Sequence, residues 1–411
     1  MVKITPFKAV CPQRARAGLV ASRPYGEYNE AEMRARLDYN PYSFLHILNP
    51  AYKFQHTISG TQKFQLIKNR YLEFKEEDTF IQDEKPCFYV YKMETRDLYC
   101  CGIIAAASAE DYKNDIIRKH EETIASREEL FKEYVKTVGF NTEPVLLTYE
   151  NKPEIQQILE KIMLRNPEYE FATRQRETHY LWKVENEAEI AQIQQFFAKM
   201  NSIYIADGHH RCASSFLLSK ESAENNENHT GKESYNHFLS YFIPEEHLKI
   251  YQFRRLITDL NGFSKEDFLI RLDEHFRIEN RKLDAYTPEQ KHQFKMYLDG
   301  EFYSLFLRKT SMHFTNTLSR LDSQILYERV LAPILGIKDL RKDKRISYIP
   351  GKKDILEMKK LVDSGEFAVG FGMMPVSISE IKQIADEGLT MPPKSTYIEP
   401  KLRSGLTIYE F

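Results

Sequence analysis

The chain has 411 residues, 58 of them basic and 60 acidic, so its formal net charge is −2. This length favours more than one domain, and the balanced charge gives no sign of a nucleic-acid or membrane-surface protein. No apolar run is long enough to span a membrane, and the stretch MVKITPFKAV lacks the apolar core of a signal peptide. The five cysteines lack metal-type spacing and favour a reducing compartment, so we expect a cytoplasmic protein.

The first half of the chain alternates strand-like and helix-like patterns. Runs rich in β-branched and aromatic residues predict strands, and apolar residues at helical spacing predict helices between them. The predicted strands cover residues 85–93, 97–107, 143–150, 178–184 and 201–206, and the predicted helices cover 152–166, 185–200 and 213–220. The polar segment 220–236 predicts a surface loop.

The second half continues the mixture. Alternating residues on both sides of Asp299-Gly300 predict a hairpin over 292–309. The spacing predicts helices over 265–276 and 318–334, a buried strand over 367–376, and a further helix opened by the capping box Ser377-x-x-Glu380. We therefore expect an α+β fold of mixed sheets with flanking helices in two lobes, residues 1–245 and 246–411, and we expect the final loop, 391–406, to return to the site.

The stretch IYIADGHHRCASS, residues 203–215, places Asp207-Gly208 between a strand and a helix rather than between two strands. Such a junction presents unpaired backbone N–H groups and the positive end of the helix dipole, which bind phosphate readily. Gly208 lets the backbone approach an anion, and Arg211 can hold phosphate oxygens in a bidentate fork. His209 and His210 add further donors, and Asp207 can bind Mg²⁺ or orient a hydroxyl.

Less specific interpretations of these residues remain open. One alternative is an ordinary solvated helix start, and a zinc site is disfavoured because no further His or Cys follows at ligand spacing. The stretch RKHEETIASRE holds His120, Glu121 and Thr123 before a helical run, where acidic residues are favoured in any case. Glu121 is nevertheless a candidate general base or Mg²⁺ ligand.

Two further stretches carry candidate binding residues. Pro24 biases Arg23 toward extended backbone in ASRPYGEYN, beside Tyr25. The proline-stiffened C-terminal stretch MPPKSTYIEPKLRSGL supplies several phosphate donors, namely Lys394, Ser395, Thr396, Lys401 and Arg403.

These stretches together resemble the family known as domain of unknown function 1015. The resemblance runs through ITPFKAV, SRPY, NPYSFLHI, EDY with KHEET, LWKV, YIADGHHR, GIKDLRKDKRISYIPG and MPPKSTYIEPKLRSGL, and so covers essentially the whole chain. The last motif and ADGHHR are the most specific. One departure is SRPYGEYN, where many relatives resemble PPYDV and Gly26 here stands in the place of Asp.

The resemblance implies a distant ParB-like or sulfiredoxin-like phosphate-binding core and a kinase that phosphorylates L-serine with pyrophosphate. A pyrophosphate donor suits a chain without a Walker-type loop or a kinase signature, because it needs Mg²⁺, cationic donors and a helix end but no adenine pocket. As a working hypothesis, the helix start after Gly208 holds the donor, and Asp207 positions Mg²⁺ or the serine hydroxyl. Glu121 acts as the base or as a second Mg²⁺ ligand, and the C-terminal cations Lys394, Lys401 and Arg403 neutralise charge on the transferring phosphoryl group. Arg23 and Tyr25 would hold the serine carboxylate.

Three other functions stay open. A phosphoserine phosphatase would use the same phosphate site with water as the nucleophile. A nucleotide-binding ParB-like regulatory module would bind nucleotide without serine-dependent turnover, and the neutral charge argues against a DNA-bound form. The third is a purely structural role. Neither the phosphoryl donor, nor the acceptor, nor the oligomeric state follows from the residues alone.

Overall fold

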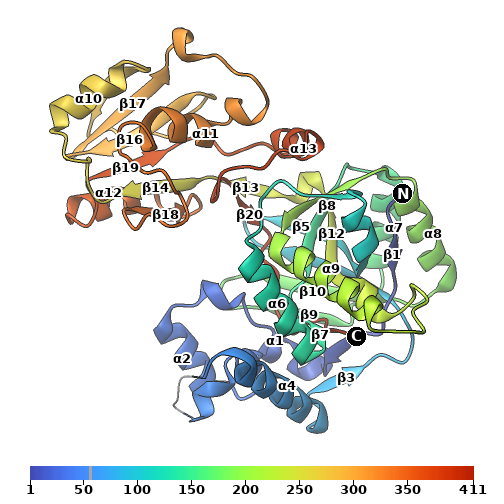
Figure 1. Cartoon of the computed structure of the whole chain (residues 1–411). Helices are drawn as coiled ribbons and strands as arrows, with labels where there is room; N and C mark the ends of the chain where they lie inside the picture. Colours follow the sequence, from blue (N-terminus) through green and yellow to red (C-terminus); the bar gives the residue numbers. More distant parts are fainter. Residues whose placement is uncertain (55–57) are drawn as a thin grey trace. The chain divides into compact units, whose positions relative to one another are not determined.

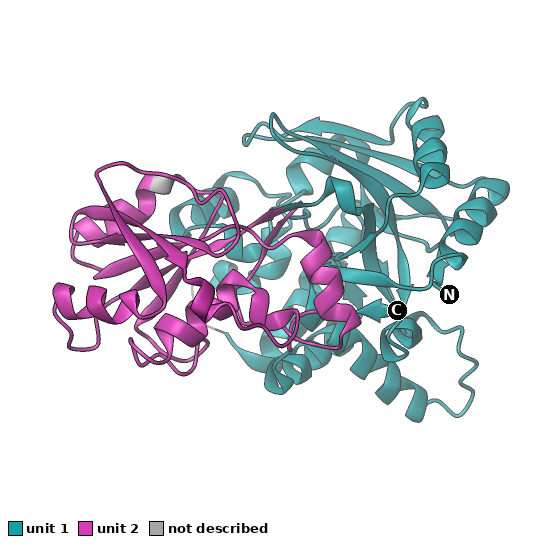
Figure 2. Ribbon diagram, turned by 90° about the horizontal axis from the view of Figure 1, so that it is seen from above, with its two compact units in different colours: residues 1–119, 123–249, 400–411 teal, residues 120–122, 250–399 magenta. Residues whose placement is uncertain are grey.

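The computed structural model describes residues 1–54 and 58–411, and it has the predicted α+β fold (Figure 1). The chain forms two compact units (Figure 2). Unit 1 comprises residues 1–119, 123–249 and 400–411, and unit 2 comprises 120–122 and 250–399. The chain passes from unit 1 to unit 2 after Lys249, and its last residues belong to unit 1 again. No helix within the described ranges is both long and apolar enough to span a membrane.

A nine-stranded mixed sheet forms the centre of unit 1. Strand β5 lies between β4 and β12 and is buried at every residue but its first, because small and β-branched side chains such as Ile103 and Ala105 pack into the core. Most pairs are antiparallel, but β12 runs parallel to β8 and β11 runs parallel to β6. The strand order is β6 (Ile117–Arg118), β11 (Ile203–Asp207), β8 (Val145–Tyr149), β12 (His237–Pro244), β5 (Tyr99–Ser108), β4 (Phe88–Glu94), β10 (Thr178–Val184) and β9 (Tyr169–Ala172), with β1 (Ile4–Thr5) paired to β5.

The helices of unit 1 begin where the local sequence favours it. Helix α7 (Pro153–Met163) has proline in its first turn, where the missing N–H costs little, and it buries the apolar face that the spacing predicted. Asn186 caps α8 (Glu187–Ala198) by accepting from two backbone N–H groups. The other helices are α1 (Ala17–Val20), α2 (Glu30–Tyr39), α3 (Leu45–Leu48), α4 (Gly60–Glu76), α5 (Ala109–Lys113), α6 (Ala125–Val138) and α9 (His209–Glu224).

The end of the chain is tied to segments of unit 1 that lie far away in the sequence. Ser404 forms a backbone bridge with Ser22, and Ile408 forms one with Val10. Two short antiparallel pairs complete this region, β2 (Val10–Pro12) with β3 (Phe80–Gln82) and β7 (Phe140–Asn141) with β21 (Tyr409–Glu410). The KLRSGL stretch is thereby fixed beside the SRPY stretch.

Unit 2 is built on a six-stranded antiparallel sheet. The predicted hairpin is confirmed as β16 and β17, and both turn residues, Asp299 and Gly300, have the positive φ that a tight two-residue turn requires. The strand order is β15 (Phe276–Lys282), β17 (Glu301–Leu307), β16 (Gln293–Leu298), β19 (Val369–Gly372), β14 (Phe253–Ile257) and β18 (Ile346–Pro350). The helices are α10 (Lys265–Asp273), α11 (Asp322–Leu326), α12 (Ile355–Asp363) and α13 (Ile378–Asp386), and β13 (Lys249–Tyr251) pairs with β20 (Tyr397–Glu399).

The long helix predicted over 318–334 is wrong. The structure has a single 3₁₀ turn at Leu318–Arg320, then α11, and then a π-helical segment at Tyr327–Leu331. Pro333 explains the early end, since proline lacks an N–H and its ring clashes with the preceding turn. The capping box predicted at Ser377 and Glu380 is confirmed at the start of α13.

Candidate functional site

The predicted strand–turn–helix junction is present in unit 1. Ile203 and Ile205 of β11 point into the core and fix the strand, and the register of β11 against β8 shifts before Asp207. Gly208 follows in the left-handed region, with φ 100° and ψ 27°, and α9 begins at His209 without a capping side chain. The first-turn N–H groups of α9 therefore lack an intrahelical acceptor, and the positive end of the helix lies beside Asp207.

Two cations contact the carboxylate of Asp207. Lys401 Nζ lies 3.2 Å and Arg211 Nη2 3.3 Å from Asp207 Oδ2. Burial raises the pKa of Asp207, but Lys401 and Arg211 outweigh it and hold the pKa below its ordinary value. Asp207 is therefore an anion at neutral pH, and the structure brings together three of the predicted site residues.

Arg211 is held over the glycine turn by backbone carbonyls. Its Nη1 donates to the carbonyl oxygens of Glu143 at 2.9 Å and Pro144 at 2.6 Å, and it lies 4.0 Å from Glu143 Oε2. The guanidinium lies so close to Gly208 that a Cβ there would be 3.1 Å from Nη2. Gly208 is thus required both for its positive φ and for the room that Arg211 occupies.

His209 is a neutral group rather than a cation. It is buried, and burial lowers the pKa of its imidazole to about 3 against the opposite effect of Asp207, with smaller lowering by His210, Lys119 and Arg211. The imidazole of His210 lies 6.4 Å from the ring of Phe131, centroid to centroid.

Arg23 and Arg403 each lie next to one residue of the Ser22–Ser404 bridge. Their guanidinium groups, however, are engaged with different side chains. Arg23 Nη2 pairs with Glu32 at 2.8 Å, and its guanidinium lies 4.3 Å from the centre of the Tyr28 ring. Arg403 is buried in an ion pair with Glu177, and its Nε lies 3.1 Å from His179 Nε2. The structure therefore does not support Arg403 as a ligand for phosphate; it places this cation in a buried network that ties the C-terminal stretch to β10.

A further arginine in this region was not anticipated from the sequence. Arg36 of α2 is partly buried, and after burial the nearby cations Arg174, Arg403 and Arg23 lower the pKa of its guanidinium. Within the described ranges Arg36 makes no ion pair with a carboxylate. A cluster of four arginines therefore lies beside the Ser22–Ser404 bridge.

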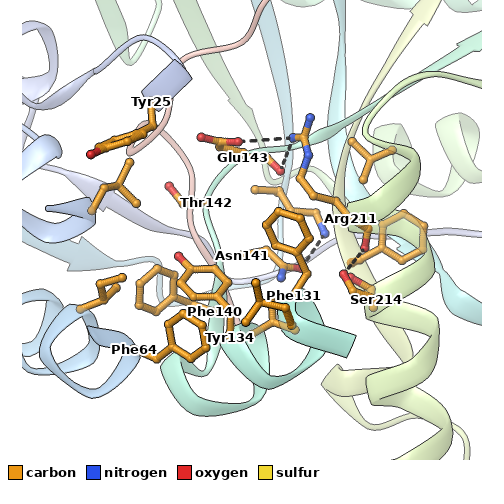
Figure 3. Close-up of a pocket in the computed structure, with 18 of the residues that line it drawn as sticks. Tyr25, Phe64, Phe131, Tyr134, Phe140, Asn141, Thr142, Glu143, Arg211 and Ser214 are labelled. Atoms are coloured by element: carbon orange, nitrogen blue, oxygen red, sulfur yellow. Dashed lines mark hydrogen bonds and ion pairs between the residues drawn. The ribbon is translucent and has the colours of Figure 1, made fainter. Parts of the chain in front are cut away.

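Arg211 also lines a cavity of about 440 Å³. Figure 3 shows Arg211 and Glu143 at one side, Tyr25 at another, and the rings of Phe64, Phe131, Tyr134 and Phe140 around the apolar part. The cavity is lined by Pro24, Tyr25, Gly26, Leu48, Lys63, Phe64, Ile67, Leu130, Phe131, Tyr134, Val135, Phe140, Asn141, Thr142, Glu143, Val145, Arg211, Ser214, Ser215, Phe238 and Leu239. Tyr25 and Gly26 of the SRPYGEYN stretch thus line the same cavity as Arg211.

Three more predicted residues, His120, Glu121 and Thr123, lie in the segment between β6 and α6. His120 and Glu121 belong to unit 2, where His120 O accepts from Met391 N–H at 2.9 Å and Glu121 forms a bridge with Met391. Thr123, in unit 1, hydrogen-bonds to Glu128.

The PPKST stretch also belongs to unit 2. Lys394 Nζ lies 5.1 Å from the centre of the Phe253 ring, and Ser395 is buried with its hydroxyl donating to Pro392 O at 2.7 Å. Thr396 follows, partly buried. These three residues belong to unit 2, whereas Asp207 belongs to unit 1.

The carboxylates of unit 1 suit Mg²⁺ more than a softer metal. Mg²⁺ takes oxygen ligands and commonly uses one or two carboxylates together with substrate phosphates and water. Asp207 and Glu143 both contact Arg211 and are such carboxylates; Glu143 was not predicted, because a single acidic residue before a strand carries no signal. In the described part of the chain, no group of three or more His, Cys, Asp or Glu side chains is arranged to hold a metal.

Fold and site together define an α+β protein with a strand–glycine–helix junction that presents cations and backbone N–H groups. The chain belongs to the family described as "Protein of unknown function (DUF1015)", whose model matches residues 4–324. No curated protein matches the chain.

Several solved structures are similar to the chain at low sequence identity. One is SbnI with a C-terminal truncation from Staphylococcus aureus, at 14% identity and a TM-score of 0.39, covering 74% of this chain and 87% of that one. Another is a free serine kinase in complex with AMP, at 13% identity and 0.37, covering 77% and 94%. A third is a conserved hypothetical protein from Pyrococcus furiosus, at 15% and 0.36, covering 71% and 91%.

Proposed function

We propose that this chain is a magnesium-dependent phosphotransferase that transfers a phosphoryl group from pyrophosphate to the hydroxyl group of free L-serine. The observation that carries the proposal is the junction at Gly208, where the start of α9, Lys401, Arg211 and Asp207 meet. Serine and pyrophosphate come from the sequence resemblance, and the junction supports a substrate that carries phosphate.

The donor would lie against the first turn of α9. Backbone N–H groups there lack intrahelical acceptors, and a helix N-terminus favours an anion. Lys401 is partly exposed and reaches Asp207, so it is the cation best able to turn toward a phosphate oxygen. Arg211 is fixed by two carbonyl groups, and this pre-organisation is what stabilisation of a transferring phosphoryl group requires.

In the proposed reaction the serine hydroxyl oxygen forms a bond to one phosphorus atom of pyrophosphate. The bond from that phosphorus to the bridging oxygen breaks, inorganic phosphate leaves, and the hydroxyl proton passes to a carboxylate. Glu121 stays our predicted base. Bound Mg²⁺ would neutralise charge on the phosphate oxygens, and Asp207 and Glu143 would hold it. Arg23 and Tyr25 stay predicted partners of the serine carboxylate.

The cavity favours a second candidate, a nucleotide-binding regulatory module. Serine and pyrophosphate are small and polar, whereas much of the cavity wall beside Arg211 is aromatic. A cavity of about 440 Å³ is large enough for a nucleobase and its sugar. This function would show as nucleotide binding without formation of phosphoserine.

Phosphorus NMR of the purified protein with Mg²⁺ and L-serine tests the proposal. Pyrophosphate, ADP or ATP would be supplied in separate tubes, and a fourth tube would hold phosphoserine alone. We expect a phosphoserine signal that grows with pyrophosphate only. Phosphoserine made from a nucleotide would change the donor, and release of phosphate from phosphoserine alone would favour the phosphatase. Folded protein that forms no phosphoserine in any tube would refute the phosphotransferase.

A further inference from the structure

The cavity of unit 1 is larger and more apolar than serine and pyrophosphate require. Its volume of about 440 Å³ lies within the range of about 300–1,000 Å³ that is common for small-molecule sites. Ile67 and Phe140 of its wall belong to a buried core cluster, and Phe64 and Tyr134 pack against that cluster with their rings 5.3 Å apart, edge to face. The apolar wall is therefore a fixed extension of the core.

Helix α6 brings large apolar side chains to this cavity without covering them. Leu130 is 55% exposed and Phe131 is 39% exposed, although both line the cavity. Tyr134 and Val135 follow one turn later and line it as well, and Figure 3 shows the rings of Phe131 and Tyr134 at its apolar part. Covering such side chains removes apolar surface from water, so the cavity favours a ligand with an apolar body.

The polar acceptors of the wall are already engaged within unit 1. Residues 141–143 each accept a hydrogen bond from a distant segment: Asn141 from Leu239 N–H at 3.3 Å, Thr142 from Gly405 N–H at 3.0 Å and Glu143 from the Ser404 hydroxyl at 3.1 Å. A ligand with several polar edges needs such partners, because buried polar atoms that stay unpaired are costly. The wall therefore suits a ligand with few polar atoms.

The charges of the wall leave one cation over. Among the described residues, the charged side chains that line the cavity are those of Lys63, Glu143 and Arg211. Arg211 lies 4.0 Å from Glu143 Oε2, so these two charges offset each other. Lys63 is partly buried, its Nζ lies 5.8 Å from the centre of the Tyr25 ring, and no Asp or Glu within the described ranges pairs with it. The wall thus suits a ligand with a single negative charge.

We propose that this cavity binds a small amphipathic acid, with its apolar body against α4 and α6 and its carboxylate at Lys63. An ammonium and a carboxylate form a charge-assisted hydrogen bond, and the apolar body covers Leu130 and Phe131. Aliphatic and aromatic acids share this chemistry, since the aromatic wall can pack against either. This ligand differs from serine, pyrophosphate and a nucleotide, and the site does not depend on the phosphotransferase proposal.

Titration calorimetry of the full chain tests this site with four separate probes. Sodium octanoate is the aliphatic acid and sodium phenylbutyrate is the aromatic acid, and their relative affinity tells which kind of body the cavity prefers. Octanol has the apolar body of octanoate without its charge, and adenosine represents a nucleoside. We expect one molecule of acid to bind per chain, more tightly than octanol or adenosine.

The Lys63→Met substitution tests the charged end of the site. It keeps the length of the side chain and removes the ammonium, so we expect octanoate to bind about 5- to 10-fold more weakly and octanol to bind as to the wild type. The matched control is Lys68→Met, since Lys68 is also a partly buried lysine of α4 but does not line the cavity. This control should bind both probes like the wild type.

The Leu130→Gln substitution tests the apolar end. It replaces an exposed leucine of the wall by a polar side chain of similar size, and it should weaken octanoate and octanol alike by about 10-fold. Leu72→Gln is the control, because Leu72 is 42% exposed on α4 and lies outside the cavity wall.

Three results would overturn the proposal. The first is that neither acid binds to the folded wild-type chain. The second is that Lys63→Met or Leu130→Gln, as folded protein, binds octanoate as tightly as the wild type. The third is that adenosine binds more tightly than both acids and is weakened by Leu130→Gln, which would assign the cavity to a nucleoside.

Discussion

The Gly208→Ala substitution tests whether the geometry of the junction, rather than its composition alone, supports the proposed chemistry. Gly208 has a φ of 100°, and an added Cβ would lie 3.1 to 3.2 Å from three atoms of the Arg211 guanidinium. The backbone penalty for a residue with a Cβ in this region is about 1–2 kcal/mol. In a chain of this size such a loss lowers Tm by only about 2–4 °C, so we expect the variant to fold.

Activity should fall much further than stability. The new methyl group pushes Arg211 away from the turn and lengthens its 3.3 Å contact with Asp207. Losing one pre-organised charge donor commonly lowers the rate by about 10²- to 10³-fold, and we expect a loss of this size in kcat for phosphoserine formation. The assay is the initial rate of phosphoserine formation at saturating serine, alongside a thermal unfolding curve.

Gly231→Ala is the matched control. Gly231 also lies in unit 1 with a positive φ, 84°, but nothing lies within 4 Å of the position that its Cβ would take. This variant carries similar backbone strain without disturbing Arg211, and it should keep wild-type activity. A folded Gly208→Ala variant that is as active as Gly231→Ala would show that the position of Arg211 does not matter to the reaction.

Three further substitutions and one titration have expected outcomes. Asp207→Asn should lower kcat for phosphoserine formation by about 10²- to 10³-fold without loss of folding, since the carboxylate that two cations keep ionised is gone. Arg403→Met should lower the free energy of unfolding by about 3–5 kcal/mol, measured with urea, because it removes the buried cation that balances the charge of Glu177. The imidazole of His209 should show no titration by NMR between about pH 5 and pH 8, the range of an ordinary histidine, because its pKa is about 3. Lys295→Met should raise the free energy of unfolding at neutral pH by a few kcal/mol, on the order that its lowered pKa of about 7 implies.

Two of these variants should also change how the free energy of unfolding depends on pH. Burial raises the pKa of Glu177, but His179 and Arg403 lower it to about 2 overall, from 4.5. This group therefore adds stability above pH 4.5 that is lost as the pH falls toward 2, and Arg403→Met should flatten that acid slope. Lys295 is a base, and burial of its ammonium lowers the free energy of unfolding. This destabilisation is absent above pH 10.5 and grows as the pH falls to about 7, so Lys295→Met should remove this dependence of stability on pH. If the free energy of unfolding depends on pH in the two variants as it does in the wild type, Glu177 and Lys295 are not the groups responsible.

The sequence predicted the elements whose determinants are local. The strand before Asp207, the turn at Gly208 and the helix that follows are set by apolar spacing and by one glycine, and the hairpin at Asp299-Gly300 is set by its turn residues. The helix predicted over 318–334 failed because its apolar pattern continues past Pro333, which ends the regular hydrogen bonding.

Features that depend on distant segments were not predictable from the sequence. Arg211 and Arg403 look alike as cations in basic motifs, yet one lies over a glycine turn and the other is buried against Glu177. The contact of Arg211 with the carbonyl of Glu143 joins segments 68 residues apart. The cavity beside Arg211 is likewise built from several separate stretches of unit 1, and no single stretch carries its aromatic lining.

The most direct test of the account is a crystal structure of the protein with Mg²⁺ and pyrophosphate. We expect pyrophosphate at the start of α9, with its oxygens against the N–H groups of His209 and His210 and within reach of Lys401. Pyrophosphate bound at another place, with the α9 start filled only by water, would contradict the assignment of this junction as the phosphoryl-transfer site.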